Sequence, residues 1–253
     1  MNRLKAIKHI RNKIKNNKPS IGSFMQIPNS SVAEIMGQSG YDWIAIDLEH
    51  GSFSPELLPD ICRALELGKT LPLARLAKSD EVSCKLALDA GVGGVILPLI
   101  EDADQLNVII DACRWPPSGK RGVGYSRANL YGKNFDKYKN EAQKPLIIAM
   151  IETIIAVDNL EKILSVKGLD AIFVGPYDLS ASMGKTGQFG DKEFIEVNKK
   201  ILSLSKKYRI APGIHVIEPS INFLKNRIKD GYLFNAYSLD TVMLSQICSF
   251  KIS

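Results

Sequence analysis

The sequence predicts a single α/β domain folded as a (βα)8 TIM barrel, with an amphipathic helix at its N-terminus. Three observations predict this fold class: eight short apolar runs alternate with amphipathic stretches, the runs are apolar along most of their length, and 253 residues suit one such barrel. Length alone also suits two small domains. We expect one domain over residues 1–253, with residues 1–18 as the first helix and residues 115–144 as a long rim loop.

The first 18 residues place Leu4, Ile7, Ile10 and Ile14 at helical spacing among basic side chains. Seven of the 33 lysines and arginines lie here, and the remaining 26 nearly balance the 27 aspartates and glutamates. A nucleic-acid or anionic-membrane role would suit so basic a helix, but no nucleic-acid-binding motif accompanies it. We interpret it as a solvated helix that closes the bottom of the barrel, and we expect no nucleic acid and no membrane as partners.

The eight expected strands lie at residues 20–27, 43–49, 71–77, 93–100, 145–152, 170–176, 211–216 and 232–238. The stretches between them are amphipathic, and several end in glycine, as helix C-termini do. Strands that are apolar along most of their length pair in parallel with both faces covered, and strict alternation with eight strands favours a closed barrel. An open doubly wound sheet is the alternative, but no GxGxxG follows the first strand.

Residues 115–144 interrupt this pattern, because they are polar, rich in glycine and aromatic residues, and too long for an ordinary connection. We expect such a loop to serve a site or a subunit contact.

The sequence carries no membrane or export signal. No apolar run reaches the roughly 18 to 20 residues that a membrane-spanning helix needs, and the opening segment lacks an apolar signal-peptide core. Cys62, Cys84, Cys113 and Cys248 lie far apart without a CxxC pair, so we interpret them as buried free thiols. Together these features predict a cytoplasmic protein.

Ionisable residues lie where several expected strands end, which is where a barrel of this type carries out its chemistry. They are Asp47, Glu49 and His50 after the second strand, Arg75 on the third, Glu152 on the fifth and Asp178 after the sixth.

Glu152 and Asp178 follow adjacent parallel strands, which stand about 5 Å apart, so both carboxylates can reach one hard cation. Mg²⁺ or Mn²⁺ suits this pair and keeps ligand positions where a 2-oxo acid can bind. The alternative is structural: Glu152 begins the next helix, and Asp178 is the N-cap of the helix that opens with Leu179.

His50 is either a general base, with Asp47 fixing its tautomer, or an ordinary surface histidine. Arg75 lies in the apolar run LPLARLA, where an unpaired charge is costly. It therefore meets either a buried acid or the carboxylate or oxyanion of a substrate. The parity of His215 on the seventh expected strand allows its side chain to point into the barrel, but no partner is apparent in the sequence, and His215 is left without a role.

Several stretches in order identify a resemblance: SVAEIMGQSGYDWIAIDLEHG, the Arg75 strand, RWPPSGKRGVG, MIET and VGPYDLSASMG. From about residue 20 to about residue 245 the chain resembles the metal-dependent (class II) pyruvate aldolases, the family of 4-hydroxy-2-oxoheptanedioate aldolase that is grouped with the citrate lyase β-subunit. The resemblance implies a TIM-barrel enzyme, a carbon–carbon lyase that cleaves a 4-hydroxy-2-oxo acid reversibly to pyruvate and an aldehyde through a pyruvate enolate. It also implies a divalent metal (Mg²⁺ or Mn²⁺, with Co²⁺ as a further candidate) and a homohexamer of swapped dimers.

The same resemblance implies a role for each site residue. Glu152 and Asp178 resemble the two metal ligands, His50 the catalytic base with Asp47 as its partner, and Arg75 the arginine that stabilises the enolate oxygen. The substrate-binding residues are expected to be Arg75, Met150, Gly175, Pro176 and Tyr177. The last helix, around residues 241–249, is expected at the subunit interface.

Two departures from the family pattern leave the aldehyde open. Met150 stands where a glutamine is common, and Tyr177 stands where a small residue is more frequent. They motivate one alternative, a related barrel that condenses an acetyl thioester with oxaloacetate, like a citrate synthase in a biosynthetic cluster. A further alternative is an inactive barrel that serves as a scaffold through its basic first helix, although all the expected polar positions are present.

Overall fold

A computed structural model describes residues 1–249, so the end of the expected domain, residues 250–253, lies outside the described residues. The strands form a closed barrel in chain order, and each pairs in parallel with its neighbours. They are β1 (Ser20–Met25), β2 (Trp43–Asp47), β3 (Leu71–Arg75), β4 (Gly94–Leu97), β5 (Leu146–Ile151), β6 (Ala171–Val174), β7 (Ala211–Val216) and β8 (Phe234–Leu239). The (βα)8 class is confirmed, and the open sheet is excluded.

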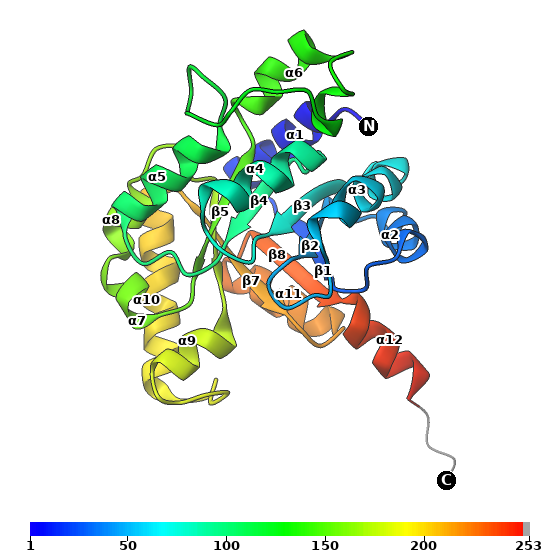
Figure 1. The fold of residues 1–253 in the computed structure, drawn as a ribbon. Coiled ribbons are helices and arrows are strands. Elements are labelled where there is room, and N and C mark those ends of the chain that lie inside the picture. Colours follow the sequence, from blue (N-terminus) through cyan, green and yellow to red (C-terminus); the bar gives the residue numbers. More distant parts are fainter. Residues whose placement is uncertain (250–253) are drawn as a thin grey trace.

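Helices surround the strands (Figure 1). They are α1 (Arg3–Lys15), α2 (Ser30–Gly37), α3 (Leu58–Leu67), α4 (Glu81–Ala90), α5 (Ala103–Cys113), α6 (Phe135–Ala142), α7 (Ile154–Asp158), α8 (Leu160–Leu164), α9 (Pro176–Ser182), α10 (Lys192–Tyr208), α11 (Ile221–Asp230) and α12 (Asp240–Cys248). Short 3-10 turns lie at Pro55–Leu57 and Arg127–Asn129. Within residues 1–249, none of these helices combines the length and the apolarity that crossing a bilayer requires.

Local chemistry sets many of the helix ends. Asp80, Asp102 and Asp191 each precede a helix, and each carboxylate accepts a hydrogen bond from a backbone N–H in the first turn. α4 and α11 end at Gly91 and Gly231, where φ values of 103° and 107° are left-handed and favour glycine. These ends match the glycines that the sequence pattern used as helix stops.

Two apolar layers hold the barrel together, one inside the strands and one between the strands and the helices. In the inner layer, Trp43 stacks on Phe234 with 4.4 Å between the ring centroids. Because alternate residues of a strand point to opposite faces, the inward position of Trp43 directs Asp47 inward as well. The same alternation directs Arg75 on β3 and Glu152 after β5 into the mouth at the carboxyl ends of the strands.

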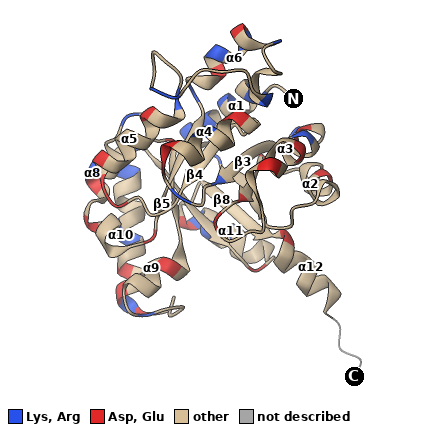
Figure 2. Ribbon diagram, in the orientation of Figure 1, with Lys and Arg blue, Asp and Glu red and all other residues tan. Residues whose placement is uncertain are grey.

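α1 closes the opposite end of the barrel. Its Ile7 and Ile10 side chains are buried and belong to the inner apolar layer. Figure 2 shows basic residues along α1. One of them, Arg11, pairs with Asp170 at 2.7 Å between Nε and Oδ1. The contacts of α1 agree with the interpretation of a solvated helix that caps the barrel bottom.

Residues 115–144 connect α5 to β5, and a connection from a helix to the next strand lies at the N-terminal end of the strands. Arg3 of α1 confirms this location, because its Nε donates to Glu141 Oε1 at 2.5 Å and its guanidinium lies 5.9 Å from the Tyr138 ring centroid. The segment therefore does not line the mouth, which differs from the expectation of a loop at the functional rim. A subunit contact for it stays a prediction.

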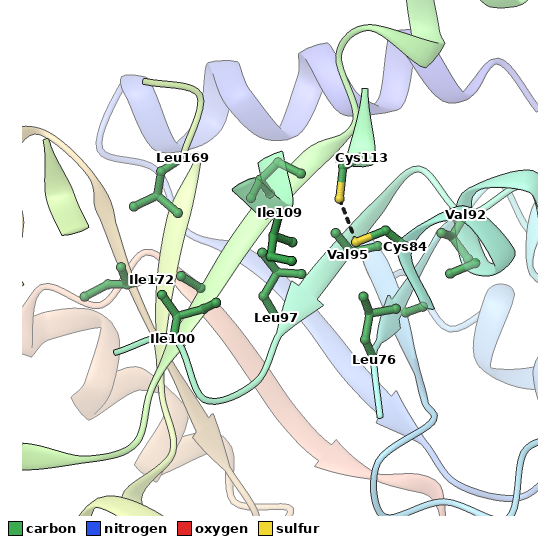
Figure 3. Close-up of a cluster of buried hydrophobic side chains, with 14 of the residues drawn as sticks. Leu76, Cys84, Val92, Val95, Leu97, Ile100, Ile109, Cys113, Leu169 and Ile172 are labelled. Atoms are coloured by element: carbon green, nitrogen blue, oxygen red, sulfur yellow. Dashed lines mark hydrogen bonds between the residues drawn. The ribbon is translucent and has the colours of Figure 1, made fainter. Parts of the chain in front are cut away.

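The cysteines are free, but they are not all buried as expected. Cys62, Cys84 and Cys113 are buried, whereas Cys248 near the end of α12 is exposed. Cys113 of α5 and Cys84 of α4 face each other with 3.0 Å between their sulfur atoms (Figure 3). Both belong to the apolar layer between the strands and the helices. Burial raises the pKa of the Cys62 thiol to about 12, as expected for a thiol that packs as a small apolar side chain.

Candidate active site

The mouth of the barrel collects the polar residues that follow the strands in the sequence. Asp47 and Arg75 are register partners on β2 and β3. Glu152 and Gly175 come directly after β5 and β6, whose last residues are also paired. Inward positions at the carboxyl ends of parallel strands face a shared space, which is where barrels of this type build their sites.

Arg75 forms a bidentate ion pair with Asp47. Its Nε and Nη2 donate to Oδ1 and Oδ2 at 2.8 and 2.6 Å, and the Asp47 side chain is fully buried. Burial alone would raise the pKa of Asp47, but the hydrogen bonds and charge of Arg75 outweigh burial and hold this pKa below its usual value. The remaining nitrogen, Nη1, lies 3.4 Å from Glu49 Oε2. Asp47 is therefore the buried acid that pairs with Arg75, and the Nη1 edge of the guanidinium faces Glu49.

Asp47 does not hold the imidazole of His50, which differs from the expectation. Its Oδ1 accepts hydrogen bonds from the backbone N–H groups of Glu49 and His50, both at 3.2 Å. The acid beside the His50 imidazole is Glu49, with 4.0 Å between Oε2 and Nε2, and the His50 side chain is 61% exposed. Asp47 therefore shapes the turn that presents His50, while Glu49 lies next to the ring.

Glu152 is held in a defined orientation by two backbone features. Its Oε2 accepts a hydrogen bond from the Leu99 N–H at 2.9 Å. A Cβ at Gly175 would lie 2.9 Å from Oε1, so any larger residue there would displace the Glu152 carboxylate from this position. Burial, together with the nearby charges of Glu49 and Asp178, raises the pKa of Glu152 to about 7.

The sequence left open that Glu152 and Asp178 serve only to start helices. The observed helix ends do not support this alternative. Thr153, not Glu152, caps α7, since its side chain accepts a hydrogen bond from Ala156 N–H. The N-cap of α9 is Gly175, and Asp178 lies in the first turn of that helix with an exposed side chain. Neither acid is thus explained as a helix cap. Asp178 is near enough to Glu152 for its charge to raise the pKa of that residue.

The composition of the site suits a divalent cation. Beyond burial, the negative charges of Asp47 and Asp178 raise the pKa of Glu49, and those of Glu49 and Asp178 raise the pKa of Glu152. The Arg75 guanidinium opposes both shifts. Glu49 Oε2 is buried, and among the described residues it has no hydrogen-bond partner. Within residues 1–249, no group of three or more His, Cys, Asp or Glu side chains is arranged to hold a metal. Two carboxylates with further non-protein ligands are the arrangement that Mg²⁺ commonly takes.

The expected substrate-binding residues lie in two different settings. Met150 is 2% exposed and belongs to the inner apolar layer, on the same strand face as Glu152. Tyr177 is half exposed, and its ring meets Phe189 edge-on at 4.9 Å between centroids. Tyr177 and Pro176 line a cavity of about 690 Å³ that extends between α10 and α11. Met150 therefore forms the floor of the mouth, whereas Tyr177 lies at a neighbouring cavity whose lining includes neither the acids nor the arginine of the mouth.

Sequence reasoning missed Gln26 and gave no role to Glu49. Gln26 Nε2 donates to Asp47 Oδ2 at 2.9 Å. One signal was available, because Gln26 lies two residues after the inward-facing Phe24. His215 also lies here, with Nε2 3.0 Å from the Ser238 carbonyl oxygen and its ring stacked on Phe24 at 4.8 Å between centroids.

The C-terminal mouth of this (βα)8 barrel contains acids, a histidine and an ion-paired arginine. This set of residues at this place in the fold is typical of an enzyme active site. Comparison with known proteins names the family. Residues 20–246 match the family model described as HpcH/HpaI aldolase/citrate lyase. The chain belongs to this family, and it is an aldolase and therefore a carbon–carbon lyase.

Two curated relatives illustrate the similarity. The 4-hydroxy-2-oxo-heptane-1,7-dioate aldolase of Escherichia coli is 31% identical over 92% of this chain and 89% of its own length. The 4-hydroxy-2-oxovalerate aldolase of Novosphingobium aromaticivorans is 40% identical over 66% of this chain, and the alignment spans 64% of that relative.

Solved structures agree on the fold. A family member from Burkholderia cenocepacia superimposes with a TM-score of 0.88 at 28% identity, covering 94% of this chain and 95% of that one. The citrate synthase SbnG superimposes with a TM-score of 0.80 at 25% identity, covering 94% of this chain and 93% of that one.

Proposed function

We propose that this protein is a class II pyruvate aldolase that cleaves a 4-hydroxy-2-oxo acid reversibly into pyruvate and an aldehyde through a pyruvate enolate. The observation that carries the proposal is the pair of carboxylates, Glu152 and Asp178, at the ends of neighbouring strands, with the Arg75 guanidinium in the same mouth. We assign these two acids as ligands of a divalent cation, Mg²⁺ or Mn²⁺, with Co²⁺ as a further candidate.

The geometry suggests how the residues divide the chemistry. When bound, the cation polarises the keto group of the 2-oxo acid and favours negative charge on its oxygen. Arg75 donates to the same developing oxyanion from a partly buried position, where water screens the interaction weakly. His50 removes the proton of the C4 hydroxyl, and the C3–C4 bond then breaks with its electron pair passing into the enolate. Asp47 holds Arg75 and the turn before His50 in place.

Substrate contacts are assigned to the residues around this centre. Met150 provides an apolar floor, and Gly175 and Pro176 form the strand-to-helix turn that precedes the Asp178 ligand. Tyr177 directly precedes the Asp178 ligand in the first turn of α9, and we assign it to the aldehyde portion of the substrate. An apolar floor and an aromatic side favour aldehydes with an apolar substituent.

The test is an assay of the purified protein with Mn²⁺, pyruvate and a panel of aldehydes, and of 4-hydroxy-2-oxo acids with pyruvate release as the readout. We expect adduct formation with at least one aldehyde and pyruvate release that disappears in Glu152→Gln. An enzyme that binds Mn²⁺ yet forms no adduct and releases no pyruvate from any of these compounds would contradict the proposal.

The citrate synthase alternative has one specific observation in its favour, the close superposition on SbnG. It would use the same site to form an enolate for condensation of an acetyl thioester with oxaloacetate. Citrate formation that depends on the thioester, without aldol cleavage, would favour it. The curated relatives support the aldolase as the leading proposal.

We also propose that the chain forms a homo-oligomer, a hexamer of swapped dimers. α12 extends away from the barrel (Figure 1), and Leu244 and Ile247 on it are 54% and 83% exposed. Exposed apolar side chains on a projecting helix favour a contact with another copy. Light scattering after size exclusion tests the assembly.

We also propose that the protein is cytoplasmic. The free thiols support this location, because the cytoplasm keeps cysteines reduced.

A further inference from the structure

Gln26 lies directly after β1, at the mouth of the barrel, and its side chain joins two separate elements. Its Nε2 donates to Asp47 Oδ2 at 2.9 Å. Its Oε1 accepts a hydrogen bond from Thr241 Oγ1 at 3.1 Å. An amide oxygen cannot donate, and the Asp47 carboxylate can only accept, so the two contacts together fix which end of the amide faces which partner.

The start of α12 holds the backbone of Gln26 as well. The Asp240 carboxylate accepts hydrogen bonds from Gln26 N–H at 2.8 Å and from Ile27 N–H at 2.9 Å. Asp240 is buried, whereas the rest of α12 is partly or fully exposed over the described residues. The first two residues of α12 therefore clamp both the backbone and the side chain of Gln26.

Asp47 connects Gln26 to the Arg75 guanidinium. Its Oδ2 accepts hydrogen bonds from both Gln26 Nε2 and Arg75 Nη2, so a rotation of the carboxylate would break both. The Arg75 guanidinium also lies 4.9 Å from the centroid of the Phe24 ring, which supports it from the barrel interior. Gln26 is the neutral side chain that completes the polar surroundings of Asp47.

We propose that Gln26, oriented by Thr241, is a positioning residue that fixes Asp47 and through it the guanidinium of Arg75. The inference rests on the proposed function, in which Arg75 faces the developing oxyanion. Gln26 acts only through Asp47 and touches no reacting atom. Because small errors in the placement of a catalytic group lower rates strongly, the first turn of α12 is coupled to catalysis.

The first test is the exchange of pyruvate methyl hydrogens with deuterium from D₂O in the presence of Mn²⁺, measured by mass spectrometry. We expect kcat for exchange to fall about tenfold in Gln26→Leu, as for the loss of one hydrogen bond to a charged group, with KM for pyruvate changed less than twofold. Thr241→Val should lower kcat in the same direction by about threefold, and Thr241→Ser, which keeps the hydroxyl, should restore it.

The second test places Gln26→Leu in an Arg75→Lys background. If Gln26 acts through Arg75, the substitution adds less than a twofold loss there, because the group that it positions is gone. An equal tenfold loss in both backgrounds, or unchanged kcat in Gln26→Leu and Thr241→Val, would overturn the inference.

A third measurement does not depend on activity. The Arg75 Nε–H, which donates to Asp47, should give a slowly exchanging NMR signal that Arg75→Lys removes. We expect its exchange with water to be about tenfold faster in Gln26→Leu and in Thr241→Val. Unchanged exchange in both variants contradicts the inference. If Nε–H exchange is faster in both variants but the wild-type protein incorporates no deuterium into pyruvate, the proposed function is contradicted while the positioning role is supported.

Discussion

Glu152 accepts a hydrogen bond at 2.9 Å from the backbone N–H of Leu99, a residue whose own φ of 50° is left-handed. The loop after β4 thus adopts an uncommon backbone conformation and offers its N–H to the carboxylate after β5. One oxygen of Glu152 is satisfied by the protein, and the other lies beside Gly175. These two contacts hold the carboxylate in the orientation in which we propose that it binds the cation.

Gly175→Ala should therefore weaken metal binding. The added Cβ would lie 2.9 Å from Glu152 Oε1 and push the carboxylate from its position. We expect the affinity for Mn²⁺, measured by calorimetry, to fall at least tenfold, by about 1.4 kcal/mol. Gly124→Ala is the control, because a Cβ there meets no described atom within 4 Å. Equal affinities for Mn²⁺ in the two variants would show that Gly175 has no role in positioning the Glu152 carboxylate.

Removal of Asp47 should destabilise the fold more than removal of an exposed acid. Asp47→Ala leaves the Arg75 guanidinium partly buried without its main partner, and we expect the free energy of unfolding to fall by about 3 to 5 kcal/mol. Asp60→Ala is matched to it, since Asp60 pairs with Arg63 but has a side chain that is 69% exposed. That control should lose less than about 1 kcal/mol. Urea unfolding measures both, and similar losses would contradict the prediction.

His50→Asn should abolish most aldol cleavage without affecting stability. A general base contributes about 10² to 10⁴ to a rate, so kcat should fall at least about a hundredfold. The His50 side chain is 61% exposed, and the melting temperature should stay within about 2 °C of the wild type. His9→Asn serves as the control, with a side chain that is 65% exposed on α1. Wild-type kcat in His50→Asn would show that another group takes the proton.

The protein should become less stable as the pH is lowered, because the buried His215 resists protonation in the folded state. Burial lowers the pKa of His215 from 6.5 to about 4. In the unfolded chain this histidine binds a proton below about pH 6.5, whereas the folded protein binds it only near pH 4. The free energy of unfolding therefore decreases as pH falls through that window, by up to roughly 3 kcal/mol, and this contribution stays constant below it.

His215→Phe should remove this part of the pH dependence while keeping an aromatic ring against Phe24. Urea unfolding at pH 7, 6, 5 and 4 should give a flatter profile for the variant than for the wild type. Parallel profiles would mean that His215 titrates alike in both states.

Much of the fold could be predicted from local patterns. Apolar runs, helix caps and closing glycines are short-range signals, so all eight strands lie where the sequence pattern expects them, within a few residues at their ends. The alternation of side chains along a strand also made the inward direction of Asp47, Arg75 and Glu152 readable from their spacing to buried neighbours. The roles that we propose for these positions come from the motif resemblance.

What only the tertiary structure decided are the contacts between residues far apart in the chain. Thr241 follows Gln26 by 215 positions, yet their side chains share a hydrogen bond because closure of the barrel brings β8 beside β1. The partner of the His50 imidazole also escaped the pattern, since Asp47 is engaged by Arg75 from the next strand and leaves Glu49 beside the ring. Spacing determines which face of a strand a residue occupies, but only the packed barrel decides which of several polar neighbours lies within reach.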